Sequence, residues 1–334
     1  MKIAVILPCY NEEVAIGGTI DEFRQALPTA EIIVCDNNSS DRTADVARAH
    51  GARVLVEPRP GKGHAVRRLL GSVDADVYVM ADGDMTYDAS VAPRMVERLV
   101  REDLDMVVGN RLTSSGEHLF RSGHRFGNWM FTTLVKTFFA STVEDLLSGY
   151  RVFSRRFVAT FPSQARGFEI ETELTVHAFE YRLPVAEVDT PYKARPEGSV
   201  SKLSTYRDGL RILIVMVLLF RDVKPLQFFG AVAIAIAVAA LGIFWPVYLT
   251  FLQTALVPRI PTIVLVSGMF VVGAVLLASG IILDRVSATR RFLHRMSYQA
   301  QAGPYQHVGE LGDLGIHEVS SAESAAAPGL SELG

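Results

Sequence analysis

Two long apolar stretches without charged residues constrain this chain more than any other feature. Residues 226–252 and 261–283 contain no Asp, Glu, Lys or Arg, and each exceeds the roughly 20 residues that an α-helix needs to cross a bilayer. A core helix of a soluble protein is the alternative for each stretch, but two uncharged stretches of this length favour membrane spans. The sequence therefore predicts a hairpin of two transmembrane helices.

Charge divides the chain into three parts. Residues 1–202 contain 24 Lys and Arg against 28 Asp and Glu, residues 203–300 contain 9 against 3, and residues 301–334 contain 0 against 5. Basic residues flank the outer sides of the two apolar stretches, which predicts a multi-pass protein of the cell (inner) membrane with both termini and its main body in the cytoplasm. The total charge of −3 excludes the strong basic field typical of nucleic-acid-binding proteins.

These changes in composition predict four parts. Residues 1–202 form a folded α/β domain, 203–225 a juxtamembrane amphipathic helix, 226–285 the transmembrane hairpin, and 286–334 a basic flank followed by a disordered acidic tail. The juxtamembrane part holds an apolar run too short to span a bilayer, which favours a helix lying in the interface. The tail is rich in Ala, Gly, Ser and Glu without a period, which is typical of disorder.

Short β-type runs alternate with helix-type segments along the first 200 residues. The β-type runs are 3–7, 32–35, 53–56, 77–80, 106–109, 150–153 and 185–188; the helix-type segments are 12–27, 41–50, 62–73, 126–139 and 169–181. Such alternation predicts βαβ units and a mostly parallel, Rossmann-like sheet. Right-handed crossovers place the carboxyl ends of parallel strands on one edge, where open α/β folds bind their ligands.

Two carboxylates follow the fourth β-type run. Asp82 and Asp84 flank Gly83, so both can face one hard cation from a turn at a strand end. Mg²⁺ and Mn²⁺ take one or two carboxylates and complete their shells with phosphate oxygens. We therefore expect a Mg²⁺ or Mn²⁺ site here; an exposed acidic turn is the alternative.

Three further motifs fall at the same predicted edge. Tyr10 follows the first β-type run, where it can stack on a base, and Asn11 beside it either binds a ligand or caps the next helix. Asp36 follows the second run and can accept hydrogen bonds from a nucleobase. Lys62 lies in a G-K-G segment that lacks the spacing of a P-loop, so it either touches a nucleotide or is solvated.

Together these motifs resemble the inverting GT-A glycosyltransferases of family 2, and within them the polyprenyl-phosphate glycosyltransferases similar to the dolichyl-phosphate mannose synthases. V-G-N-R at 108–111, D-L-L-S-G-Y-R at 145–151 and S-K at 201–202 extend the resemblance, which covers about residues 1–285. The resemblance implies a GT-A fold and an enzyme that transfers a hexose from a UDP- or GDP-sugar to a polyprenyl phosphate. It also implies a divalent metal ion and a lipid-linked sugar made at the cytoplasmic face of the membrane.

The resemblance also implies the residues of the site. The expected donor-binding residues are Pro8, Tyr10, Asn11, Glu12, Asp36, Lys62, Asp82 and Gly83. The expected catalytic residues are Asp84, Asp145 and Arg111, with Asp82 and Asp84 on the metal. The expected ligands of the acceptor phosphate are Arg111, Arg125, Arg151 and Lys202. Since a phosphate acceptor is ionised at pH 7, cations that hold it are needed more than a strong base.

Several alternatives stay open at this point. For Asp145 the alternative is a structural ion pair with an arginine, and Glu169, Glu171 and Glu173 are expected to be surface charges. The family usually has Asp where this chain has Asn37, and often Gln where it has Thr86.

Two other functions compete with the lipid-linked sugar synthase. A processive polysaccharide synthase would carry a Q-x-x-R-W element, which the sequence lacks, and a non-catalytic membrane scaffold would not need the D-G-D segment. Nothing in the motifs names the sugar; we favour a UDP-hexose, and expect assembly into a homo-oligomer through the spans by analogy only.

Overall fold

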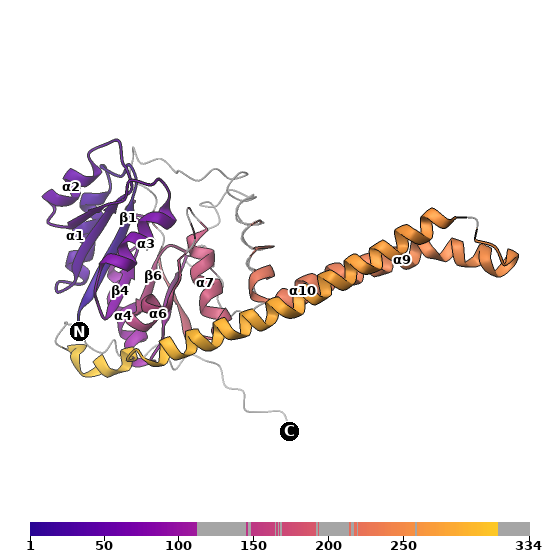
Figure 1. Ribbon diagram of the computed structural model, residues 1–334. Coiled ribbons are helices and arrows are strands. Elements are labelled where there is room, and N and C mark those ends of the chain that lie inside the picture. Colours follow the sequence, from indigo (N-terminus) through magenta and orange to yellow (C-terminus); the bar gives the residue numbers. More distant parts are fainter. Residues whose placement is uncertain are drawn as a thin grey trace, which may run out of the picture. The chain divides into compact units, whose positions relative to one another are not determined.

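The computed structural model describes residues 1–111, 145, 148–163, 165, 167, 169–191, 193, 214, 217–218, 220–257 and 259–312. The chain divides into two compact units (Figure 1). The first comprises Met1–Asp208 with Tyr298–Gly334, and the second comprises Gly209–Ser297.

Seven strands of the first unit form one sheet in the order β3-β2-β1-β4-β6-β5-β7. They are β1 (Ile3–Cys9), β2 (Glu31–Asp36), β3 (Arg53–Val56), β4 (Val77–Met80), β5 (Met106–Asn110), β6 (Arg151–Ser154) and β7 (Val185–Asp189). All seven coincide with the predicted β-type runs to within about two residues. Only β6 is antiparallel to its neighbours among these strands, so the other six end at one edge, called here the carboxyl edge.

Helices cover both faces of this sheet. They are α1 (Ile16–Ala26), α2 (Thr43–Ala49), α3 (Lys62–Ser72), η1 (Ala89–Val91), α4 (Ala92–Arg101), α6 (Arg155–Thr160), α7 (Ile170–Glu180) and η2 (Pro304–Glu310). On one face, Ile20 of α1 and Met95 of α4 share a core with Leu7 of β1. Alternate residues of a strand point to opposite faces, and α3, which packs on β1, β2 and α7, covers the other face.

The first helix begins later than the sequence predicts. The pattern favours a helix from residue 12, whereas α1 begins at Ile16. Asn11 has a left-handed backbone (φ 53°), and Glu12 then makes a turn in which its carbonyl accepts from the N–H groups of Ala15 and Ile16. The expected helix at 126–139 lies outside the described residues.

The second unit contains two long antiparallel helices, α9 (Pro225–Thr254) and α10 (Ile260–Gln299) (Figure 1). By length and composition both could cross a membrane, and each holds a window of mean hydropathy 2.4. One series of their buried residues recurs every seven positions: Ala233, Ala240 and Val247 on α9, and Val266, Gly273, Gly280 and Ser287 on α10; Pro225 and Gly230 of α9 are buried outside this series. This is the repeat of a coiled-coil seam, and small residues let the two backbones approach closely.

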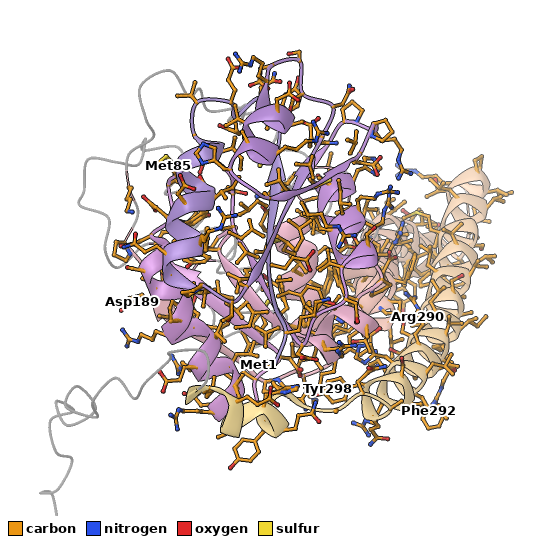
Figure 2. The ribbon with its side chains drawn as sticks, turned by 90° about the vertical axis from the view of Figure 1, so that its left-hand side faces the viewer. Met1, Met85, Asp189, Arg290, Phe292 and Tyr298 are labelled. Atoms are coloured by element: carbon orange, nitrogen blue, oxygen red, sulfur yellow. The ribbon has the colours of Figure 1, made fainter. Side chains whose placement is uncertain are left out.

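The chain after α10 does not form the disordered tail that the sequence predicts from about residue 300. Residues 298–312, called here the return segment, comprise the last two residues of α10 and the chain that follows, and they belong to the first unit, at the edge where the parallel strands begin. The Tyr298 hydroxyl donates to Asp105 over 2.7 Å, and Leu311 is 2% exposed within the core that contains α4. Figure 2 shows Met1 and Tyr298 at this edge. The prediction is therefore wrong up to residue 312, and residues 313–334 lie outside the described part.

Candidate active site

The D-G-D segment leaves β4 at the carboxyl edge, as the sequence predicts. Gly83 faces Cys9 so closely that a Cβ at position 83 would clash with the Cys9 sulfur. Asp84 is buried, and its Oδ1 accepts hydrogen bonds from the Thr86 hydroxyl over 2.6 Å and the Thr86 N–H over 3.3 Å. Thr86 therefore orients the Asp84 carboxylate.

Lys62, the first residue of α3, connects this segment to α7. Its Nζ lies 2.5 Å from Oδ1 of Asp82 and 2.5 Å from Oε1 of Glu171. Burial lowers the pKa of Lys62, but the two carboxylates more than offset this effect and hold the pKa above its ordinary value. Burial also raises the pKa of Glu171, against the opposing effect of Lys62.

Two of the glutamates expected on the surface are buried instead. Glu171 is 5% exposed at its side chain, and Glu169 is buried with its Oε1 accepting from the Gly167 N–H over 3.0 Å. The prediction of surface charge was wrong for both, because α7 packs against α3 and turns these positions inward.

Asn37, one of the two residues that depart from the family pattern, has a buried side-chain amide that holds the loop between β3 and α3. Its Nδ2 donates to the carbonyls of Glu57 (3.1 Å) and Arg59 (2.7 Å), and its Oδ1 accepts from the Gly61 N–H (2.7 Å). An ionised aspartate could not donate these two bonds. Asn37 therefore positions the residues that lead into Lys62.

Sequence reasoning did not find the ion pair within the same loop. Glu57 is buried and accepts from Nε (2.7 Å) and Nη2 (3.1 Å) of Arg59. These hydrogen bonds lower the pKa of Glu57 to about 2. The sequence feature that could have indicated this ion pair is the segment E-P-R-P-G-K-G, in which two prolines stiffen the chain around Glu57 and Arg59.

The segment after β1 meets the segment after β2, as predicted. The Asn11 N–H donates to Ser39 Oγ over 2.9 Å, and its Oδ1 accepts from the Ser40 N–H over 2.8 Å. Asn11 thus ties two loops together and does not cap α1. Tyr10 beside it is 46% exposed, while Asp36 is buried with its Oδ1 accepting from the Ser39 N–H over 3.3 Å.

Two more expected donor-binding residues shape this edge through their backbones. Pro8 lies inside β1, paired with Cys35 of β2. The Glu12 N–H donates to Thr43 Oγ1 over 2.8 Å, and the Glu12 side chain is buried.

Arg111 and Asp145, both expected to be catalytic, form an ion pair with each other. Nε and Nη2 of Arg111 donate to the two carboxylate oxygens of Asp145 over 2.7 and 2.9 Å. Asp145 is fully buried, and its N–H donates to Oε1 of Glu187 over 3.1 Å. The arginine ion pair left open for Asp145 is therefore present.

Arg151 occupies a structural position. It is fully buried, and its guanidinium donates to the Ser148 carbonyl (2.9 Å) and the Thr175 hydroxyl (2.8 Å). Burial lowers its pKa to about 10. These surroundings do not support the expected contact with a phosphate, and the other two expected phosphate ligands, Arg125 and Lys202, lie outside the described residues.

Gly149 packs directly on the Lys62–Asp82 pair. A Cβ at position 149 would lie 2.8 Å from Oδ2 of Asp82 and 3.1 Å from Nζ of Lys62. The Gly149 N–H donates to the Tyr87 hydroxyl over 2.9 Å. The segment before β6 thus forms one wall beside the D-G-D segment, and only glycine fits there.

The residues present fit a Mg²⁺ or Mn²⁺ ion. Within the described part of the chain, no three His, Cys, Asp or Glu side chains gather as ligands around one point. Asp82 and Asp84 would supply two hard carboxylate oxygens, and phosphate oxygens and water would complete the shell. The ammonium of Lys62 against Asp82 shows that this position favours a cation.

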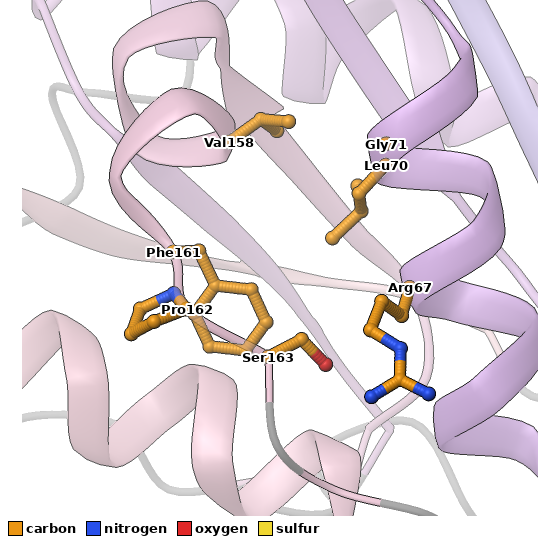
Figure 3. A pocket seen from close by; sticks show the side chains of 7 residues that line it. All are labelled: Arg67, Leu70, Gly71, Val158, Phe161, Pro162 and Ser163. Atoms are coloured by element: carbon orange, nitrogen blue, oxygen red, sulfur yellow. The ribbon is translucent and has the colours of Figure 1, made fainter.

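A separate pocket of about 460 Å³ lies between α3 and the end of α6 (Figure 3). Its lining residues are Arg67, Leu70, Gly71, Val158, Phe161, Pro162 and Ser163. None of them is an expected site residue, so this pocket is not the site at the carboxyl edge.

Comparison with known proteins decides the family. Residues 4–161 match the model of glycosyl transferase family 2. Glycosyltransferase AglJ of Haloferax volcanii is 30% identical to this chain over 86% of it and 95% of AglJ. The chain belongs to glycosyltransferase family 2. The 290 aligned residues exceed the length of Met1–Asp208, so the likeness to AglJ reaches into the apolar helices.

Two other similar proteins carry more specific names. A dolichyl-phosphate hexose transferase of Haloferax volcanii is 30% identical over 63% of this chain and 90% of its own length. Glucosyl-3-phosphoglycerate synthase of Mycobacterium tuberculosis, solved with Mn²⁺ and UDP-glucose, superposes with a TM-score of 0.52 at 27% identity, covering 64% of this chain and 78% of that chain. This family 2 glycosyltransferase therefore has the GT-A fold.

Proposed function

We propose that this glycosyltransferase transfers a hexose from a nucleotide sugar, UDP-hexose in the first instance, to a polyprenyl phosphate with inversion at the anomeric carbon. The proposal rests on one observation. The same chain contains a D-G-D segment beside Lys62 and two helices apolar enough to cross a membrane. The dolichyl-phosphate hexose transferase similar to this chain supports the acceptor. The Mn²⁺ and UDP-glucose complex of the solved neighbour supports the donor and the metal.

The donor lies at the carboxyl edge in this proposal. Tyr10 offers an exposed ring for the base, and Asp36 accepts hydrogen bonds from it. Asp82 and Asp84 would supply the carboxylate oxygens that hold the metal. When bound, the metal neutralises the charge that develops on the leaving diphosphate. Lys62 adds a buried positive charge beside Asp82. Its attraction for the negative diphosphate is stronger in this buried position than it would be in water.

The acceptor phosphate attacks the anomeric carbon, and the nucleoside diphosphate leaves with the electron pair of the bond that breaks. The phosphate is already ionised at neutral pH, so no group must remove a proton. We assign Asp145 to hold Arg111, whose guanidinium is pre-oriented for a phosphate oxygen. Arg125 and Lys202 stay predictions as further phosphate ligands.

The hairpin of α9 and α10 gives the lipid acceptor a place to meet the enzyme. A polyprenyl chain stays in the bilayer while its phosphate lies at the interface. We propose that the two helices span the membrane and that the catalytic unit faces the cytoplasm, because the basic residues lie on the outer flanks of the hairpin.

A transfer assay tests this function. Purified full-length protein in detergent is mixed with undecaprenyl or dolichyl phosphate, Mn²⁺ or Mg²⁺, and one of a panel of radiolabelled UDP- and GDP-sugars. We expect label to enter the organic phase from one UDP-hexose. If the protein hydrolyses a nucleotide sugar and labels no lipid, the acceptor proposal is wrong and a soluble glycan or protein acceptor replaces it.

A further inference from the structure

We propose that Lys62 exchanges partners when the metal binds. Without metal its ammonium is shared between Asp82 and Glu171; with a divalent ion on Asp82, Glu171 alone keeps the ammonium. Glu171 is then a positioning residue that lets Asp82 release Lys62. This inference rests on the proposed metal site at Asp82 and Asp84.

The geometry places one cation between two carboxylates. Nζ of Lys62 lies 2.5 Å from Asp82 and 2.5 Å from Glu171. The side chains of Lys62 and Glu171 are 11% and 5% exposed, whereas that of Asp82 is 29% exposed. A metal ion that enters with the nucleotide sugar therefore reaches the more exposed Asp82 first. Glu171 is more deeply buried and remains paired with the ammonium.

A metal ion and the Lys62 ammonium compete for the carboxylate of Asp82. Two cations on one carboxylate repel each other strongly when partly buried. The backbone at Gly149 closes one side of Lys62 Nζ, since a Cβ at position 149 would lie only 3.1 Å from Nζ. The ammonium therefore needs another acceptor within reach.

Glu171 has the acceptor that this exchange requires. Its Oε1 already binds Lys62, while its Oε2 is buried without a hydrogen-bond partner among the residues that the structure describes. A buried carboxylate oxygen without a partner costs free energy, and an ammonium has three donors. Once Asp82 binds the metal, Lys62 can give a second hydrogen bond to Glu171 and compensate that oxygen.

The exchange makes a specific prediction for metal binding. In Glu171→Gln the ammonium keeps Asp82 as its one carboxylate partner among the described residues, so Lys62 competes more strongly with the metal. We expect the affinity for Mn²⁺ to fall about tenfold. In Lys62→Met the competitor is gone, so adding Glu171→Gln should change the affinity little.

The measurement is a titration with Mn²⁺ alone, without donor, followed by the electron paramagnetic resonance signal of free Mn²⁺. It uses full-length protein in detergent and the two single variants with their double variant. Asp84→Asn identifies the site, because it should abolish binding. Glu180→Gln removes a carboxylate elsewhere on α7 and should leave the affinity unchanged. If Glu171→Gln does not fold, Glu171→Asp replaces it, because its shorter carboxylate no longer reaches Lys62.

Each outcome decides the matter. A loss with Glu171→Gln that disappears in the Lys62→Met background supports the exchange. An equal loss of Mn²⁺ affinity in both backgrounds overturns the exchange, because Glu171 then acts only as a nearby negative charge. No loss of affinity in either background overturns the exchange as well. In both cases the metal site at Asp82 and Asp84 stands. If the wild-type protein binds no Mn²⁺ and transfers sugar in EDTA, the metal site and the exchange are both overturned.

Discussion

At the scale of single residues, the site contains positions where the observed hydrogen bonds need one particular type of side chain. Asn37 both donates and accepts in the loop that leads to Lys62. Thr86 binds Asp84 through its hydroxyl. Both residues depart from the usual family pattern, and both hold the site in place with short hydrogen bonds. Asn37 therefore holds the loop that leads to Lys62, and Thr86 holds the Asp84 carboxylate.

Asn37→Asp tests the role of the amide. An aspartate would lose two donated hydrogen bonds and place negative charge against two carbonyl oxygens. We expect a loss of about 2–3 kcal/mol in the free energy of unfolding, measured as a lower thermal midpoint, together with a higher KM for the donor. Asn38→Asp is the matched control, because Asn38 is exposed and its left-handed backbone (φ 60°) also suits Asp. Equal effects of the two changes would contradict this role.

At the scale of elements, the site is built by loops that converge at the carboxyl edge. The segment before β6 contributes Gly149, which packs on the Lys62–Asp82 pair between α3 and β4. The antiparallel direction of β6 brings its leading segment to the same edge where the parallel strands end. One strand of opposite direction thus adds a wall that a fully parallel sheet would lack.

Gly149→Ala tests this wall. The added methyl group would meet Asp82 and Lys62 within about 3 Å, so we expect a loss of sugar transfer of about tenfold or more with little change in the fold. Gly71→Ala is the matched control, since a Cβ at position 71 of α3 meets nothing within 4 Å and alanine favours a helix. Full activity in Gly149→Ala would show that the wall does not constrain the site.

The sequence predicted the strands and the edge better than the direction of individual side chains. Apolar runs between turn residues marked all seven strands, because short-range patterning determines where strands form. The pattern could not show that Glu171 and Arg151 point inward. Their partners Lys62 and Thr175 lie on other elements, and such contacts exist only once the chain has folded.

At the scale of the whole molecule, the chain after the second long helix returns to the catalytic unit. In the return segment, Leu311 joins the core beside α4, and Tyr298 binds Asp105, which also pairs with Arg156. The composition of this segment resembled a disordered tail, because its few anchoring residues are scattered among Gly, Ala and Gln. The return segment therefore belongs to the catalytic unit.

Leu311→Ala tests that assignment. Removing a buried leucine side chain typically costs about 2–3 kcal/mol, so we expect a lower thermal midpoint of the catalytic unit. Tyr305→Ala changes the same segment at a side chain that is 60% exposed, and it should leave the midpoint nearly unchanged. If both variants unfold like the wild type, the return segment does not stabilise the catalytic unit.

The most direct test of the proposed function compares metal-dependent transfer to polyprenyl phosphate in Asp84→Asn and in Asp74→Asn. Asp74 is an aspartate with an 80% exposed side chain, so its variant controls for loss of one carboxylate. We expect wild type and Asp74→Asn to move label from a UDP-hexose into the organic phase with Mn²⁺ and to stop in EDTA. Asp84→Asn should lose about 100-fold or more of the rate. Undiminished transfer by Asp84→Asn, or transfer in EDTA, would contradict a metal-assisted reaction at the D-G-D segment.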